Sequence, residues 1–445
     1  MASLTANPIL SLTGTWSEPL TFLLMLLLFG LLAIAGGWQI GLALLTAAWF
    51  GAFINGEFFP LRHLVEGAFS YLDPILVIAT AMIFMRTLAD GGALDSLGRT
   101  IERRFQTKPA LLLALLMLMI MFPGMITGSS TASVLTTGAL AASIIAGLGL
   151  SKERTAAIIA MGSILGMVAP PVNIPAMIIG GGIDLPYSGF DAPLALASFP
   201  LALVILYHLA RPALVASKRM PSPADNASMA SPRKGQVSPV PLWRALTAPA
   251  AAAILMLAPR LAPSHIPDPG LPFIFLFAAT IGVVVLPKFA LGSSMLRATE
   301  ESLPVLGILC GVGAFIQVMT LTGARGWLVS IMTGAPPWAI LAAATVSIPL
   351  FGAVSAFGSA SVLGVPFLLA LLGRNEIVTT AALSLLTALG DLMLPAALAA
   401  TLAAQVAGVD DRRKVLHLCI VPALLTIAVA VLMLIFAPWI GRWLG

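Results

Sequence analysis

The chain has 445 residues, of which 59% are hydrophobic and 9% are charged, and its mean hydropathy is +1.03. This composition excludes an ordinary soluble domain, because such domains carry about 25% charged residues. The net charge of +5 does not indicate nucleic-acid binding, since the basic residues lie in short loops between apolar segments. We expect an all-α, multi-pass membrane protein that binds no nucleic acid.

Ten apolar segments are candidate transmembrane helices, because each offers roughly the 20 residues that a bilayer requires. They lie near residues 20–35, 39–54, 72–89, 156–182, 192–216, 245–262, 272–287, 302–321, 377–407 and 417–437. Two of them, 156–182 and 377–407, are longer and interrupted, so each predicts a broken helix.

Two further regions, 109–148 and 337–373, consist of shorter apolar arms on either side of a polar stretch. Each arm has about 13 to 15 residues and reaches roughly 20 Å, less than the hydrocarbon core of roughly 30 Å. We therefore predict two re-entrant hairpins. Their tips should lie inside the protein, because irregular backbone at membrane depth is tolerated only within protein or beside a wet cavity.

The distribution of Lys and Arg orients this arrangement. With the N-terminus outside, seventeen basic residues fall in inner loops and five on the outer side. Positive charge in short loops marks the cytoplasmic face. The distribution predicts that both termini lie on the periplasmic side.

The two halves resemble each other. "PALLLALL…GSSTASVL" from Pro109 corresponds to "PWAILAAA…AFGSASVL" from Pro337, which pairs Ser133 with Ser361. Five spans in each half would turn the second copy upside down, and such inverted repeats are typical of secondary transporters. The sequence predicts a first inverted repeat at 1–216, a Pro/Ser-rich cytoplasmic linker at 217–243 and a second inverted repeat at 244–445. A chance coincidence of small residues is the alternative.

The tip of the first hairpin places the hydroxyls of Ser129, Ser130, Thr131 and Ser133 at the start of a helix. The positive end of the helix dipole favours an anion there, and nearby oxygen atoms suit a cation such as sodium. Close packing of membrane helices through small residues is the alternative interpretation.

The two interrupted segments carry the other candidate groups. Pro170, Pro171 and Pro175 remove backbone donors, and Asn173 adds an amide, which predicts an unwound stretch rather than a simple kink. Asp391 lies in the second segment, where a charge costs about 2.5–3.5 kcal/mol. We interpret it as a cation ligand or proton carrier; a buried ion pair or a neutral acid is the alternative.

Two other charged residues, Arg86 and Asp90, lie near one membrane edge and are expected to pair with each other.

Motifs for enzymatic chemistry are missing from the sequence. It contains no HExxH and no GxSxG, and the dipeptide Gly-Lys of a phosphate-binding loop never occurs. We expect no enzyme, no organic cofactor and no transition metal, with an ion gradient as the energy source. An intramembrane enzyme using Asp391 and a tip serine is the alternative from another class.

Three stretches resemble one protein family: residues 72–97, the motif "GSSTASV", and "AAIIAMGSILGMVAPPVNIPAMIIGG" at 156–181. They are similar to the large membrane subunit of tripartite ATP-independent periplasmic (TRAP) transporters, in the ion transporter superfamily of elevator-type carriers. The resemblance implies sodium-coupled import of organic-acid anions such as C4-dicarboxylates across the bacterial inner membrane. It also implies two partners, a small four-helix membrane subunit and a periplasmic substrate-binding protein.

The family motifs place two cation sites and a substrate site on this sequence. The first cation site would comprise Ser129, Ser130, Thr131, Gly166, Pro170 and Asn173, and the second Ser355, Gly358, Ser359, Gly390 and Asp391. The substrate would lie between the tips, at Ser130, Thr131, Ser133, Asn173, Ser359 and Ser361.

The second half departs from the family pattern, because Pro395 stands alone where a Pro-Pro pair is usual, and Asp391 is added. Proton coupling through Asp391, and a stand-alone carboxylate carrier that works as a homodimer without a binding protein, therefore stay open.

Overall fold

The computed structural model describes residues 17–217, 240–262, 264–287 and 289–444. Within these ranges the chain is helical, and its one β-bridge is an isolated contact between Leu372 and Arg374. Eight of the described helices are long and apolar enough to cross a membrane. The predicted class, an all-α polytopic membrane protein, is confirmed. The predicted linker at 217–243 lies almost wholly outside the described residues.

The elements of the first half follow the predicted order. They are α2 (Glu18–Gly30) with a π-helical extension (Leu31–Ala35), α3 (Ile40–Ile54), α4 (Leu61–Phe69), α5 (Leu72–Asp90), α6 (Ala93–Phe105), α7 (Pro109–Thr127), α8 (Ser130–Ser133), η2 (Val134–Gly138), α9 (Ala139–Gly147), α10 (Lys152–Val168), α11 (Ile174–Gly181) and α12 (Asp191–Ser217).

The second half repeats this order of spans, hairpin and broken helix. Its elements are α13 (Leu242–Leu261), α14 (Leu271–Val285), α15 (Leu291–Leu321), α16 (Ala324–Thr333), α17 (Pro337–Gly352), α18 (Ala356–Ser359), η4 (Ala360–Gly364), α19 (Val365–Ala370), α20 (Glu376–Ala388), η5 (Leu389–Leu392), α21 (Leu398–Ala407) and α22 (Arg412–Leu444). Every predicted span is present as a helix or broken helix, although α15 starts about ten residues earlier than predicted.

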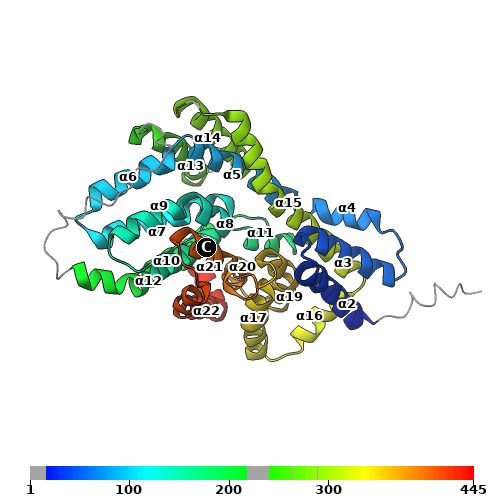
Figure 1. Ribbon diagram of the computed structural model, residues 1–445. Coiled ribbons are helices and arrows are strands. Elements are labelled where there is room, and N and C mark those ends of the chain that lie inside the picture. Colours follow the sequence, from blue (N-terminus) through cyan, green and yellow to red (C-terminus); the bar gives the residue numbers. More distant parts are fainter. Residues whose placement is uncertain (1–16, 218–239, 263, 288, 445) are drawn as a thin grey trace, which may run out of the picture.

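The helices form two groups (Figure 1). The frame consists of α2–α6 and α13–α16; most of it runs along the top and right of the view, and α16 lies near the bottom. The hairpin group consists of α7–α12 and α17–α22, and it lies below the helices at the top of the frame. Within the frame, α15 packs against α3, α4 and α5; within the hairpin group, α10 packs against α7, α12 and α21.

Glycine allows the frame helices to approach closely. A Cβ atom added to Gly311 would lie 2.3 Å from the carbonyl oxygen of Gly41, and one added to Gly313 would lie 1.9 Å from that of Gly67. Small residues at such crossings are how membrane helices gain packing energy when lipid offers no hydrophobic driving force. They hold α15 against α3 and α4.

The arms of the first hairpin are longer than predicted. The first arm has 19 residues and the second, Ser130–Gly147, has 18. The expected length of about 13 to 15 residues was wrong for two reasons: Pro123 stays inside α7, and the serines of the tip belong to the second arm. The first arm ends at Gly128, whose φ of +62° is the left-handed conformation that glycine adopts freely.

Three short helices of the frame, α4, α6 and α16, were not predicted from the sequence. In α6 the apolar residues Leu94, Leu97, Ile101 and Phe105 recur every three or four positions, which is the helical period. A search limited to spans of membrane length passes over such a pattern, because the helix has 13 residues and carries several charges.

Candidate functional site

The two hairpin tips share one construction. At the first tip the Ser129 hydroxyl accepts a hydrogen bond from the backbone N–H of Ala132 (3.3 Å). At the second tip the Ser355 hydroxyl accepts one from the N–H of Gly358 (3.1 Å). Each serine therefore caps the N-terminus of its second arm.

A second serine ties the arms of each hairpin together. The Ser133 hydroxyl donates to the carbonyl oxygen of Ile120, and the Ser359 hydroxyl donates to that of Ile348 (2.6 Å). The structural counterpart of Ser133 is thus Ser359, and the predicted pairing with Ser361 was wrong. The chain that leads into the second tip is two residues shorter than its counterpart, a deletion that the shared letters "ASVL" disguise. Ser361 instead donates to the carbonyl of Gly358 (3.0 Å).

Both broken helices cross the first arm of a hairpin at a pair of glycines. A Cβ atom on Gly166 would lie 2.4 Å from the carbonyl oxygen of Met121, and one on Gly124 would lie 2.8 Å from Gly166 and Met167. In the second half, a Cβ atom on Gly390 would lie 2.5 Å from the backbone of Gly352. Gly166 and Gly390 therefore allow the backbone of each broken helix to touch its hairpin just before the break.

The first break is closed by the side chain of Asn173. Its Oδ1 accepts from the N–H of Ala176 (2.9 Å) and caps α11, while its Nδ2 donates to the carbonyl of Val168 (3.0 Å) and to the hydroxyl of Ser384 (2.8 Å). The Asn173 N–H donates to the Tyr187 hydroxyl (3.0 Å). This fully buried side chain joins both ends of the break to α20.

The second break carries a carboxylate instead of an amide. Asp391 lies in the short 3₁₀ turn η5 and is 8% exposed. The hydroxyl of Ser130, at the tip of the first hairpin, donates to its Oδ2. Asp391 was predicted in one cation site and Ser130 in the other, yet their side chains are in contact.

A cavity of about 350 Å³ lies between the two tips and the frame. Of the predicted site residues, Ser129, Ser130, Thr131, Ser355 and Asp391 line it. Its wall on the opposite side comes from α3, α5 and α15, including Ile40, Met82, Pro304 and Ile308. The carboxylate and hydroxyl oxygens at one wall are the hard ligands that small cations prefer.

The remaining predicted residues lie behind this wall. Gly166 and Gly390 form the crossings, Asn173 closes the first break, and Ser133 and Ser359 tie the hairpin arms. Pro170 lies in the unwound stretch after α10. The N–H of Gly358 donates to the Ser355 hydroxyl, and the Ser361 hydroxyl donates to the carbonyl of Gly358. They shape the tips rather than face the cavity.

Two charged residues of the frame also line the cavity, and neither was predicted there from the sequence. Arg86 of α5 and Glu301 of α15 form an ion pair, with Nε of Arg86 2.7 Å from Oε2 of Glu301. The predicted pairing of Arg86 with Asp90 was wrong, since Asp90 accepts from Arg297 (3.1 Å) and from Ser294 (2.6 Å). Arg86 and Asp90 are four residues apart on α5, but both find partners on α15.

Comparison with known proteins identifies the family. The profile of the family described as "Tripartite ATP-independent periplasmic transporter, DctM component" matches residues 21–440. The chain belongs to this family. The DctM component is a membrane subunit of a secondary transporter, so the predicted family and the coarse function are confirmed. No curated protein sequence matches the chain.

Solved structures show the same fold. The YdaH transporter of Alcanivorax borkumensis has a TM-score of 0.59 to this DctM-family chain at 19% identity, with 96% of this chain and 98% of that one covered. MtrF of Neisseria gonorrhoeae, from a class of antimetabolite efflux pumps, has a TM-score of 0.59 at 14% identity, with 96% of each chain covered. At these identities the likeness establishes the fold alone.

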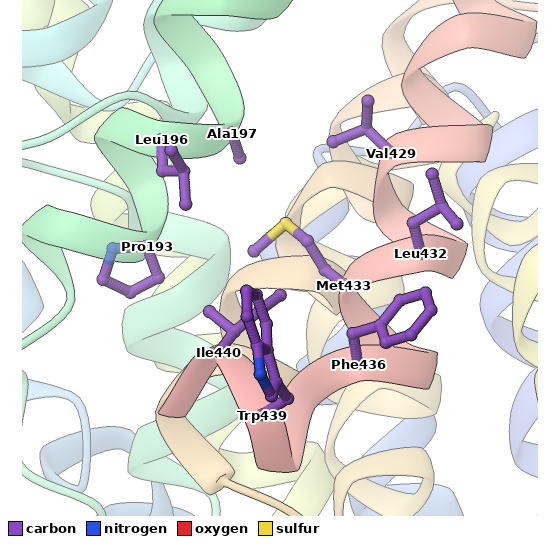
Figure 2. Close-up of a pocket in the computed structure, with 9 residues that line it drawn as sticks. All are labelled: Pro193, Leu196, Ala197, Val429, Leu432, Met433, Phe436, Trp439 and Ile440. Atoms are coloured by element: carbon purple, nitrogen blue, oxygen red, sulfur yellow. The ribbon is translucent and has the colours of Figure 1, made fainter. Parts of the chain in front are cut away.

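A larger hollow, of about 550 Å³, lies away from the tips between α12 and α22. Figure 2 shows its lining, which is apolar apart from the indole nitrogen of Trp439. Leu196, Leu432, Phe436 and Trp439 around it are each more than half exposed. Because a membrane covers such surfaces with lipid, the groove offers an ion or a carboxylate no partner. The smaller cavity at the tips is the better candidate.

Proposed function

We propose that this DctM component is a sodium-coupled secondary transporter that imports organic-acid anions such as C4-dicarboxylates. The observation that carries the proposal is the cavity in which both hairpin tips meet Asp391 and the frame. Serine hydroxyls, a carboxylate and helix N-termini converge there, and broken helices are where secondary transporters bind substrate and coupling ions.

In this proposal Asp391 and Ser130 form the centre of a cation site that the two halves share. Ser129, Thr131 and Ser355 supply further oxygen atoms at the same wall. The contact between Ser130 and Asp391 links the tip of one half to the break of the other. A bound cation neutralises the carboxylate and can be shared by Asp391 and Ser130. A proton at Asp391 also removes the charge, but it weakens the hydrogen bond from Ser130, because an ionised carboxylate is the stronger acceptor.

Ion coupling also sets a minimum stoichiometry. One elementary charge moving through 100 mV releases about 2.3 kcal/mol, so two sodium ions release about 4.6 kcal/mol. That suffices for roughly a thousandfold accumulation of a neutral solute. An inside-negative potential opposes entry of an anion, so a carboxylate requires more than one coupling cation.

Transport would proceed by an elevator movement of the hairpin group against the frame. In this conformation Tyr71 of the frame donates to the carbonyl of Ile178 (3.0 Å), and Arg325 donates to that of Gly182 (2.5 Å). Both contacts hold α11 against the frame and must break when the group moves. The grouping of the helices in Figure 1 supports such a movement, because each hairpin packs mainly within its own group.

Members of the family are one component of a tripartite transporter. This membership supports two proposed partners, a small four-helix membrane subunit and a periplasmic substrate-binding protein. The proposed location is the bacterial inner membrane with both termini periplasmic. Co-purification of the chain with a small helical subunit tests the proposed membrane partner. Isolation as a homodimer that transports without added protein would favour the stand-alone carrier.

The coupling ion is tested by thermal unfolding of the purified chain in sodium, potassium and choline chlorides. A ligand at a hundred times its Kd that binds only the folded state stabilises it by about 2.7 kcal/mol. We expect selective stabilisation by sodium, reduced in Ser130→Ala and lost in Asp391→Asn. Because protons compete for the same carboxylate, the sodium response of the unsubstituted chain should weaken at acidic pH.

Matched controls are available on the same elements. Ser143→Ala removes an exposed hydroxyl from the first hairpin away from its tip, and Asp90→Asn removes a carboxylate outside the cavity. Both should keep the sodium response. Equal stabilisation by all three salts would refute sodium coupling, and a response to pH alone would favour protons at Asp391.

A further inference from the structure

The cavity at the hairpin tips is lined by three charged groups among the described residues: Arg86, Glu301 and Asp391. Asp391 lies at the wall of the hairpins, whereas Arg86 and Glu301 come from the frame on the other side. The pair is two-pronged, since both Nε and Nη2 of Arg86 contact the Glu301 carboxylate. The side chains are 18% and 35% exposed, so the pair is not sealed off.

A purely structural role for this pair is a weak explanation. Helices α5 and α15 are already joined by a second ion pair, Asp90 with Arg297, and Ser294 donates to the same carboxylate. An ion pair that loses its hydration gains little over apolar packing, so it adds little stability where helices already pack closely. The pair at Arg86 differs from the second pair in facing the cavity.

We propose that Arg86 binds the carboxylate of the transported anion, and that Glu301 holds the guanidinium in place until this carboxylate displaces it. The inference rests on the proposed function and adds its anion-binding residue. A guanidinium recognises any carboxylate through two parallel N–H···O bonds, so substrate replaces Glu301 with like geometry. Glu301, the more exposed partner, turns toward water.

This exchange solves a problem that the tips alone leave open. Among the described residues, the wall of the hairpins carries hydroxyls and Asp391 and no basic side chain, so an anion there meets a negative charge unless a cation is bound. Arg86 supplies the missing positive charge from the opposite wall. A substrate held between Arg86 and the tips also bridges the frame and the hairpin group in this conformation.

The test measures carboxylate affinity and sodium affinity separately. The full-length chain, with its small subunit where that co-purifies, is titrated in saturating sodium chloride with succinate, pyruvate and gluconate. For each carboxylate, the midpoint is the concentration that gives half of the maximal thermal stabilisation. Sodium midpoints are measured without carboxylate. The variants are Arg86→Gln/Glu301→Gln, Glu301→Gln alone and, as the matched control across the same two helices, Asp90→Asn/Arg297→Gln.

We expect at least one carboxylate to stabilise the unsubstituted chain. The double variant at Arg86 should raise its midpoint about tenfold to a hundredfold, because a hydrogen-bonded charge is lost. Glu301→Gln should lower the midpoint, because the competitor is gone. The sodium midpoints and the control pair should stay unchanged. Arg86→Lys should lie between the double variant and the unsubstituted chain, since lysine keeps the charge and loses the fork.

The opposite directions of these effects distinguish binding from structure. An unchanged carboxylate midpoint in the double variant, or a raised midpoint in Glu301→Gln, overturns the inference and leaves the proposed function intact. A response to sodium without a response to any of the three carboxylates also overturns it. If neither sodium nor a carboxylate stabilises the unsubstituted chain, the proposed function fails first.

Discussion

The two broken helices solve the same problem with different chemistry. At the first break Asn173 satisfies the exposed backbone on both sides and caps α11, and its amide is fully used within the protein. At the second break no side chain caps α21, Ala397 stands at the N-cap with φ of +43°, and a carboxylate faces the opposite hairpin. The polar groups at the first break are satisfied within the protein, whereas the carboxylate at the second break is the group that we propose binds a cation.

The difference shows that a repeat in sequence does not imply two equivalent sites. Both breaks follow a glycine crossing and both hairpins have serine-capped tips, so the scaffold is duplicated. The group that carries charge is present in one copy only. Matched substitutions in the two copies should therefore differ most at the breaks and least in the shared scaffold.

Replacing the amide of Asn173 by a carboxylate should destabilise the chain strongly, whereas replacing the carboxylate of Asp391 by an amide should destabilise it little. In Asn173→Asp the two donated hydrogen bonds are lost and a charge faces the Val168 carbonyl in a fully buried place. We expect a loss of about 3–5 kcal/mol, as for other uncompensated buried charges. The reverse change, Asp391→Asn, should cost less than about 1 kcal/mol without sodium, because the amide oxygen still accepts the hydrogen bond from Ser130.

Thermal unfolding in choline chloride measures both changes without contribution from a bound cation. Equal losses at the two breaks would show that Asp391 is as structural as Asn173, and the proposed cation site would then lose its centre.

The glycine crossings should be equally intolerant in the two halves. In Gly166→Ala and in Gly390→Ala the new methyl group meets backbone atoms at 2.4 Å and 2.5 Å, and backbone moves less readily than a side chain. We expect each to lose about 3 kcal/mol in thermal unfolding, at the upper end for overpacking. Gly307→Ala is the control, because nothing lies within 4 Å of its Cβ position. A crossing that tolerates alanine would be one that is open in solution.

The sequence sufficed for much of the fold because its main signals are local. Spans follow from runs of apolar residues, and the breaks follow from Pro170, Pro171 and Pro395. Most positions were therefore predicted within a few residues, although α15 starts about ten residues earlier than predicted. The repeat also aligned the sequences of the two hairpins, whose tips are built alike, but a two-residue deletion ahead of the second tip displaced Ser133 from its counterpart Ser359. Short frame helices such as α6 carry no apolar run of membrane length and were missed.

The site was predictable only in part, because its contacts join distant segments. Ser129, Ser130, Ser355 and Asp391 stood out as polar groups in apolar surroundings, and they do line one cavity. Ser133, Ser359 and Ser361 stood out as well, but they bond within the hairpins behind the cavity wall. The sequence placed Ser130 and Asp391 in two separate cation sites. Nothing in the sequence indicated that Ser130 contacts Asp391, which lies 261 positions further along the chain. The partner of Arg86 was likewise hidden, since Glu301 lies 215 positions away and Asp90 is the nearer acid in the sequence.

The serine caps should contribute about equally at the two tips. Ser129→Ala and Ser355→Ala each remove the acceptor for one backbone N–H, which costs about 1 kcal/mol in other helices. Ser143→Ala, in the same hairpin as Ser129 but exposed, should change the free energy of unfolding by less than about 0.5 kcal/mol. A markedly larger loss at Ser129 would indicate that the first tip also depends on the neighbouring contact between Ser130 and Asp391.

The smallest effect concerns the uncapped start of α21. Ala397 is buried and left-handed, a conformation that costs a residue with a Cβ atom roughly 1 kcal/mol and glycine almost nothing. Ala397→Gly should therefore stabilise the chain by up to about 1 kcal/mol in thermal unfolding. Ala399→Gly, equally buried but inside the helix, should destabilise it by about the same amount, because glycine is unfavourable in a helix interior. Opposite signs for two changes of the same residue type, two positions apart, would establish that the second break is held in a conformation its own sequence disfavours. Equal signs would mean that the break relaxes, and that only the first break, with Asn173, is a fixed joint.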